Sequence, residues 1–77
     1  MKYNEITEQK LNYIRKLYPE GTRIELISMD DPYSKLTPGC KGTVKYVDDM
    51  ATIHVSWDNG SSLGVIYGVD EIRKIKD

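Results

Sequence analysis

Apolar side chains recur every three or four positions near the start of the chain, which is the spacing of an amphipathic helix. Acidic residues precede basic ones in this segment, as the helix dipole prefers, and Pro19 and Gly21 stop it. We therefore predict a helix over residues 3–18 whose apolar face packs on the rest of the domain; docking of that face on a partner is the alternative. The apolar stripe consists of Tyr3, Ile6, Leu11, Ile14, Leu17 and Tyr18.

From residue 21 onward, apolar and polar side chains alternate with the period of two that is typical of strands. The side chains expected on the inner faces of these strands are Ile24, Leu26, Val44, Ile53, Val55 and Trp57. The alternation predicts strands over residues 22–28, 42–47, 52–57 and 62–67, and then a short closing element with Ile72 and Ile75.

Turn-forming residues separate the predicted strands. Residues 29–38 form a long loop with two prolines, and Asp48 with Asp49 marks a hairpin turn. Asn59-Gly60 predicts a tight type I′ hairpin, because both residues tolerate positive φ. Five short strands with little helix indicate a mainly β fold, a small antiparallel barrel that closes on itself; an open, strongly bent sheet capped by the helix is the alternative.

A length of 77 residues allows one domain, with residues 1–20 as the helix and connector and residues 21–77 as the barrel. A domain of this size buries only about 60–65% of the surface of its unfolded chain. Its core is therefore one layer of side chains, without room for a deep active-site cavity. The single cysteine and the lack of a secretion signal or a membrane-length apolar run predict a cytoplasmic protein without membrane contact.

The charge balance argues against unspecific binding of nucleic acid. The net charge is −1, from 11 basic and 12 acidic residues mixed along the chain, whereas neutralising phosphates needs a local excess of basic residues. One basic face remains an alternative, because Lys35, Lys41 and Lys45 lie close together in the sequence.

The sequence offers little for catalysis or metal binding. His54 and Ser56 share one face of a predicted strand, but parallel side chains without a third orienting group favour a solvent-facing histidine over a nucleophile and its base. The carboxylates at the loops and turns lack the spacing of a calcium loop, and aspartate is a common turn residue. We expect no catalytic residue, no metal and no cofactor.

The aromatic residues are the most informative side chains. The chain has six tyrosines, one tryptophan and no phenylalanine, and amphipathic rings are enriched at protein interfaces. We predict that a groove between the long first loop and a later hairpin is lined by Asp30, Asp31, Tyr33, Trp57 and Tyr67. The alternative is that the tyrosines cap the barrel ends and that Trp57 anchors the core, which its phase with Ile53 and Val55 favours.

Four segments resemble a small family of uncharacterised domains from bacteria, their phages and mobile elements. They read GTRIELISMDDP (21–32), PGCKGTV (38–44), VDD (47–49) and IHVSWDNGSSL (53–63). The resemblance covers roughly residues 19–75 and carries no assigned activity. A looser likeness, on the Gly-Thr-Val, Val-Asp-Asp and Trp-Asp-Asn-Gly segments, is to SH3-like barrels of the mind-bomb and KOW-like types, and it implies a five-stranded SH3-like fold.

These observations predict a non-catalytic protein-binding module. The mobile-element resemblance allows an accessory factor that acts on a host or element-encoded protein, for example by inhibiting a defence enzyme, and acidic turns could mimic phosphate in a basic cleft of that partner. The alternative is a nucleic-acid-binding module that uses barrel-face aromatics and the three lysines. The residues expected to contact a protein partner are Asp30, Asp31, Tyr33, Asp48, Asp49, Trp57, Asp58 and Tyr67.

Overall fold

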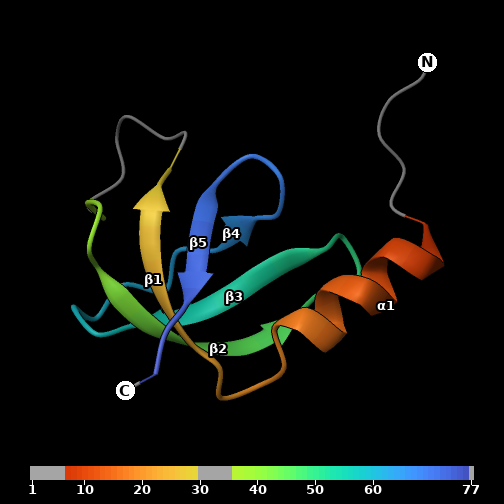
Figure 1. Cartoon of the computed structure of the whole chain (residues 1–77), viewed down its shortest axis with the longest axis horizontal. Helices are drawn as coiled ribbons and strands as arrows, with labels where there is room; N and C mark the ends of the chain where they lie inside the picture. Colours follow the sequence, from red (N-terminus) through yellow and green to blue (C-terminus); the bar gives the residue numbers. More distant parts are fainter. Residues whose placement is uncertain (1–6, 30–35, 77) are drawn as a thin grey trace.

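One helix precedes five strands in the computed structural model, which describes residues 7–29 and 36–76 (Figure 1). The mainly β fold with an N-terminal helix is thus confirmed. The elements are α1 (Glu8–Leu17), β1 (Arg23–Ser28), β2 (Lys41–Val47), β3 (Thr52–Trp57), β4 (Val65–Ile66) and β5 (Glu71–Lys74).

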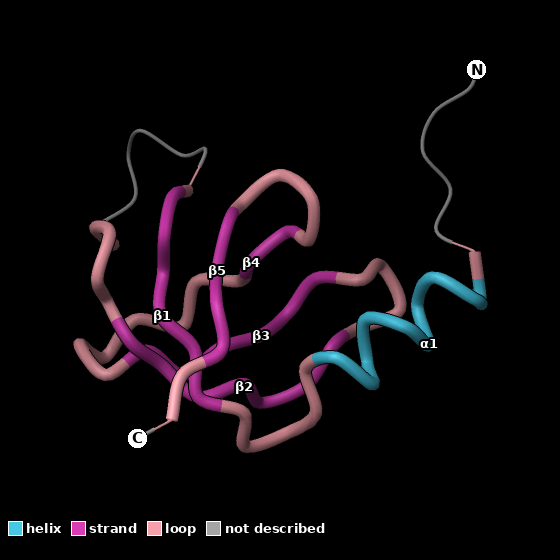
Figure 2. The backbone as a smooth tube through the Cα atoms, in the orientation of Figure 1, coloured by secondary structure: helices cyan, strands magenta, loops and turns pink. Residues whose placement is uncertain are grey.

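The strands form one antiparallel sheet in the order β4-β3-β2-β1-β5 (Figure 2). The last strand returns beside the first, so β4 and β5 are the two edges of the sheet. Within the described residues no ladder joins these edges, and a turn over residues 67–70 connects them, with a single bridge between Tyr67 and Asp70. The strand order agrees with the predicted small barrel, but among the described residues β4 and β5 do not pair to close it.

Helix α1 begins later than the predicted residue 3. Thr7 has extended dihedral angles, and its hydroxyl accepts a hydrogen bond from the Lys10 N–H at 3.1 Å, so Thr7 is the N-cap. Residues 3–6 of the predicted helix lie outside the described residues. At the other end, the Tyr18 N–H still bonds the Ile14 carbonyl at 2.9 Å before the chain turns toward β1. Ile14 is fully buried, which confirms that the apolar face of the helix packs on its own domain.

The core follows the predicted alternation. The inner faces of β1, β2 and β3 are buried, with Ile24, Ile53 and Val55 each 0% exposed. Trp57 is only 2% exposed, and its indole Nε1–H donates to the Leu63 carbonyl at 2.8 Å. The structure therefore confirms Trp57 as a core anchor and corrects its predicted place in a partner-binding groove, because a buried ring offers a partner almost no surface.

Two local predictions about the β3–β4 connection are wrong. Asn59 does not have positive φ; only Gly60 does, at +94°, and the Gly60 N–H bonds the Trp57 carbonyl at 2.9 Å, so the turn is not type I′. The returning strand is also shorter than residues 62–67, because Val65–Ile66 alone pairs with β3. In the segment before β4, the Leu63 carbonyl instead accepts a hydrogen bond from the indole N–H of Trp57.

Candidate functional site

Three tyrosines meet between α1 and the turn that joins β4 to β5. The ring of Tyr67 lies 6.5 Å from the ring of Tyr13 and 6.5 Å from the ring of Tyr18, at interplanar angles of 76° and 63°. These edge-to-face arrangements are the favoured geometry of aromatic pairs. We call Tyr13, Tyr18 and Tyr67 the tyrosine cluster; it joins the helix to the C-terminal part of the sheet.

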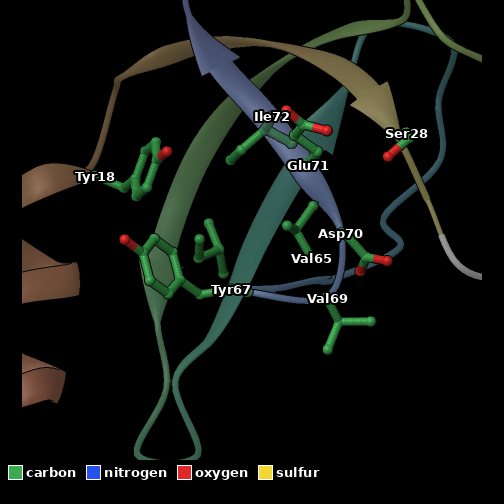
Figure 3. Close-up of a pocket in the computed structure, with 10 residues that line it drawn as sticks. Tyr18, Ser28, Val65, Tyr67, Val69, Asp70, Glu71 and Ile72 are labelled. Carbon is green, nitrogen blue, oxygen red and sulfur yellow. The ribbon is translucent and has the colours of Figure 1, made fainter.

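A cleft of about 380 Å³ opens beside this cluster, between the two edges of the sheet (Figure 3). Its apolar lining includes Ile53 and Val65, which are both 0% exposed and belong to β3 and β4. Tyr18 and Tyr67 form one side of the cleft. The complete lining is Tyr18, Ser28, Ile53, Val65, Tyr67, Gly68, Val69, Asp70, Glu71 and Ile72.

A second, more open hollow lies on the helix side of Tyr67. It has a volume of about 450 Å³ and is lined by Thr7, Gln9, Lys10, Tyr13 and Tyr67. The Lys10 ammonium lies 5.8 Å from the centroid of the Tyr67 ring, and the Lys74 ammonium lies 5.7 Å from that of Tyr18. Both tyrosines thus present ring faces at which a cation is favourable.

The surroundings of Tyr18 and Tyr67 favour the protonated form of their phenols. Burial raises the pKa of Tyr18 above its usual value of 10.0, and the neighbouring Tyr67 and Tyr13 raise it further. Burial also raises the pKa of Tyr67, together with the electrostatic effect of Tyr13 and the hydrogen bond between the two side chains, which favours the protonated phenol of Tyr67. Both phenols are therefore protonated at neutral pH.

A family model described as a domain of unknown function (DUF4314) matches residues 7–75. The chain belongs to the DUF4314 family. The match begins at the N-cap of α1 and ends after β5, so the helix and the whole sheet are part of the DUF4314 unit. Comparisons with curated proteins and with solved structures gave no match. In the described part of this DUF4314 domain, the helix is too short and too polar to span a bilayer.

Of the acidic residues predicted for partner binding in this DUF4314 domain, the three described ones lie in two different turns. Asp48 and Asp49 lie in the turn before β3, whereas Asp58 lies in the turn after it. Each carboxylate has a partner of its own: Asp48 bonds His54 at 2.8 Å, Asp49 bonds Arg15 at 2.9 Å, and Asp58 bonds Arg23 at 2.8 Å. The hydrogen bond from Arg23 lowers the pKa of Asp58, and the bond with His54 lowers that of Asp48.

Of the predicted groove residues, the structure places Tyr67 in a cleft. Asp30, Asp31 and Tyr33 lie outside the described residues, and Trp57 is in the core. Sequence reasoning missed Tyr13 and Glu71. A signal for Tyr13 existed, because an aromatic ring off the apolar stripe of a helix is left exposed.

His54 belongs to a different arrangement on the outer face of the sheet. Its Nε2 lies 2.8 Å from Asp48 Oδ2, and the ring of Tyr46 stacks on its ring at 4.4 Å between centroids. Within residues 7–29 and 36–76, no hydrogen bond joins His54 to Ser56, and no group of three metal-ligating side chains is present. In this DUF4314 domain, His54 thus helps to hold Asp48, the residue that accepts backbone hydrogen bonds in the β2–β3 turn.

Proposed function

We propose that this DUF4314 domain is a non-catalytic protein-binding module and that its binding surface is the cleft beside Tyr18 and Tyr67. The observation that carries the proposal is the cleft itself, an opening with two tyrosine rings and the partly buried Ile72 on its sides, and with polar groups at its margin. Its volume of about 380 Å³ falls in the range of roughly 300–1,000 Å³ that is usual for ligand sites.

The chemistry of the lining supports a protein ligand. Tyrosine rings combine a large apolar area with a polar hydroxyl, and they are enriched among the residues that contribute most to protein interfaces. The acidic turns support the proposal less, because Asp48, Asp49 and Asp58 are paired within the domain. We therefore assign the contact surface to the cleft and not to phosphate mimicry by these turns.

The absence of catalysis in this proposal rests on His54, the histidine of the chain. A general base must lie within hydrogen-bond reach of the group from which it takes a proton. Within residues 7–29 and 36–76 no hydrogen bond joins His54 to Ser56, and the Asp48 carboxylate that bonds the ring also accepts two backbone N–H groups of the turn. The pair has a structural task, and this supports a binding role.

A variant-controlled affinity purification tests the proposal. The tagged domain, Tyr67→Ser and Tyr46→Ser are each used to capture proteins from a nuclease-treated bacterial lysate. A captured protein is then purified and titrated against all three by calorimetry. Tyr46 is a matched control, because it is an exposed tyrosine outside the cleft.

We expect Tyr67→Ser to weaken binding at least tenfold while Tyr46→Ser binds as the parent does. Circular dichroism establishes that both variants are folded. Equal binding by folded Tyr67→Ser and by the parent would remove the cleft from the proposal. A lysate in which every retained protein is lost on nuclease treatment would remove the protein-binding role.

The narrower version of the proposal concerns the partner. The segments over residues 21–63 that resemble domains of phages and mobile elements support an accessory factor, located in the cytoplasm, that acts on a host or element-encoded protein. Inhibition of a defence enzyme is one such activity. This version rests on the sequence resemblance alone.

A second candidate function is nucleic-acid binding on the outer face of the sheet. A bulge in β2 breaks the alternation at Lys45, so that Lys45 and Tyr46 are both exposed, and Tyr46 stacks on His54. A stacked aromatic beside a lysine is the kind of surface that binds single strands. This candidate predicts binding that weakens steeply with salt and is lost in the double variant Lys41→Glu, Lys45→Glu.

A further inference from the structure

We infer that the cleft receives an arginine side chain from the partner protein. The inference rests on the proposed function, because it specifies what the cleft recognises. It follows from three properties of the described lining: the sign of its charged groups, the faces that its tyrosines present, and the apolar surface between them.

Every charged group among the described residues of the lining is acidic. Asp70 and Glu71 stand next to each other where the turn enters β5. Glu71 is exposed and forms no ion pair within residues 7–29 and 36–76. Two neighbouring carboxylates make the margin of the cleft favourable for a cation and unfavourable for an anion.

Asp70 is held in position by the backbone that it caps. Its Oδ2 accepts the Ile66 N–H at 2.9 Å, and its own N–H donates to the Ile66 carbonyl at 2.9 Å. These two bonds tie the start of β5 to β4 across the mouth of the turn. The carboxylate is therefore preorganised, so a ligand cation that binds it does not have to order it first.

The tyrosine rings explain why the cation is a guanidinium. The ammonium groups of Lys10 and Lys74, which lie over Tyr67 and Tyr18, show that these ring faces attract cations within the protein itself. A guanidinium is planar and less strongly hydrated than an ammonium, so it stacks on an aromatic ring and donates in parallel to a carboxylate. Both partners are present in this cleft, in Tyr67 and Glu71.

The stem of the arginine matches the remaining lining. Ile72 is partly buried and supplies apolar surface between the tyrosines and the carboxylates, while Val65 is buried beneath this surface (Figure 3). Arginine buries its methylene groups on such surface while its charged end stays at a polar margin. A purely apolar side chain would fill the same space but would desolvate the carboxylate of Glu71 without pairing it, which is unfavourable.

A pair of peptides that differ only in charge tests the inference. Both are acetylated and amidated heptapeptides of glycine, alanine and leucine, and the central residue is arginine in one and citrulline in the other. Citrulline has nearly the same shape but no charge. Each is titrated into the 15N-labelled domain while amide chemical shifts are followed by NMR.

We expect the arginine peptide to shift the amides of Tyr67, Gly68 and Glu71 and to bind at least fivefold more tightly than the citrulline peptide. Glu71→Gln should reduce this preference to twofold or less. Asp70→Asn should reduce it too, since asparagine keeps an oxygen for the Ile66 N–H and loses the charge. Glu20→Gln is the matched control, because it removes an exposed carboxylate outside the lining and should retain the preference.

Equal affinity for the two peptides, or no shift at the cleft with either at millimolar concentration, would overturn the assignment of an arginine. A preference that survives in both Asp70→Asn and Glu71→Gln would overturn it as well. None of these results removes the protein-binding role, which depends on whether Tyr67→Ser loses the captured protein. The two proposals therefore fail separately.

Discussion

Arg15 holds the carbonyl oxygen of Val47 with two donors, Nε at 3.2 Å and Nη2 at 3.1 Å. The two residues are 32 positions apart, and the contact joins the last turn of α1 to the end of β2. Together with the buried Ile14, it fixes how the helix lies on the sheet. Because Tyr18 is the C-cap of this helix and lines the cleft, this docking also positions one side of the cleft.

Removing the guanidinium should loosen the helix. In Arg15→Ala the Val47 carbonyl loses both donors, and we expect the free energy of unfolding to fall by about 1–2 kcal/mol, the usual effect of losing hydrogen bonds to a charged group at a half-buried site. Urea denaturation measures the change. Lys16→Ala is the control, since it truncates the exposed neighbour and should change stability by less than about 0.5 kcal/mol. Equal effects of the two variants would contradict a specific role for Arg15.

Two adjacent aspartates should differ sharply in their effect on stability. Asp48 accepts hydrogen bonds from the Met50 N–H and the Thr52 N–H, each at 2.9 Å, and it also bonds His54. These bonds hold a turn in which Ala51 has a φ of +65°, a conformation that is strained for a residue other than glycine. We expect Asp48→Ala to cost about 1–3 kcal/mol. Asp49→Ala should cost less than about 1 kcal/mol, because the Asp49 side chain is 94% exposed and its pair with Arg15 is at the surface.

The charge of Asp48 should also make the stability of the domain depend on pH in acid. The bond with His54 and those from the turn lower the pKa of Asp48 below 3.8, so the fold favours its charged form. The stability from this group is present above pH 3.8 and is lost as the pH falls through the lower, folded-state pKa. Thermal unfolding measured between about pH 6 and pH 2 should show a shallower loss of stability in Asp48→Asn than in the parent chain. Parallel curves would contradict the assignment.

The positions of the strands could be predicted because they depend on local patterns. Alternation of Ile24 with Leu26, and of Ile53 with Val55 and Trp57, requires only that one face of each strand is buried. The same phase argument favoured Trp57 as a core residue. Its burial in the structure excludes the alternative place in a groove. The sequence also predicted the β2–β3 turn at Asp48 and Asp49.

The candidate site could not be predicted in the same way, because its members come together only through tertiary structure. Tyr13 and Tyr67 are far apart in the sequence, and they meet because Arg15 docks the helix against the end of β2. The predictions about the β3–β4 connection were wrong for a related reason. The Asn59 side chain accepts a hydrogen bond from the Ser61 N–H at 3.0 Å, and the Leu63 carbonyl accepts one from the Trp57 indole. A two-residue turn motif predicts neither contact.

Gly42 should tolerate no side chain. A Cβ at this position would lie 2.7 Å from Val55 Cγ1 and 3.0 Å from Trp57 Cε3, and both of these neighbours are buried. We expect Gly42→Ala to destabilise the domain by about 1–3 kcal/mol through overpacking. Ser62→Ala is the control, because Ser62 is an exposed residue of the β3–β4 connection and a surface substitution should change stability by less than about 0.5 kcal/mol. Chemical denaturation of the two variants decides between these expectations.

The tyrosine cluster should make the domain sensitive to alkali. Burial raises the pKa of Tyr18 and of Tyr67 above 10.0, so the folded state favours the neutral phenols. The stability from this preference is fully present below pH 10.0 and is lost as the pH rises through the folded-state values.

Urea denaturation at a series of pH values from about 8 to 11 measures this loss. We expect Tyr18→Phe and Tyr67→Phe each to make the decline above pH 10.0 shallower, because each removes one of the phenols that must ionise. Tyr46→Phe removes an exposed hydroxyl outside the cluster and controls for the loss of any one phenol. If all three variants follow the parent curve, the cluster does not link folding to tyrosine ionisation. If only the two cluster variants depart from it, the packing of α1 against the β4–β5 turn is what the alkaline transition reports.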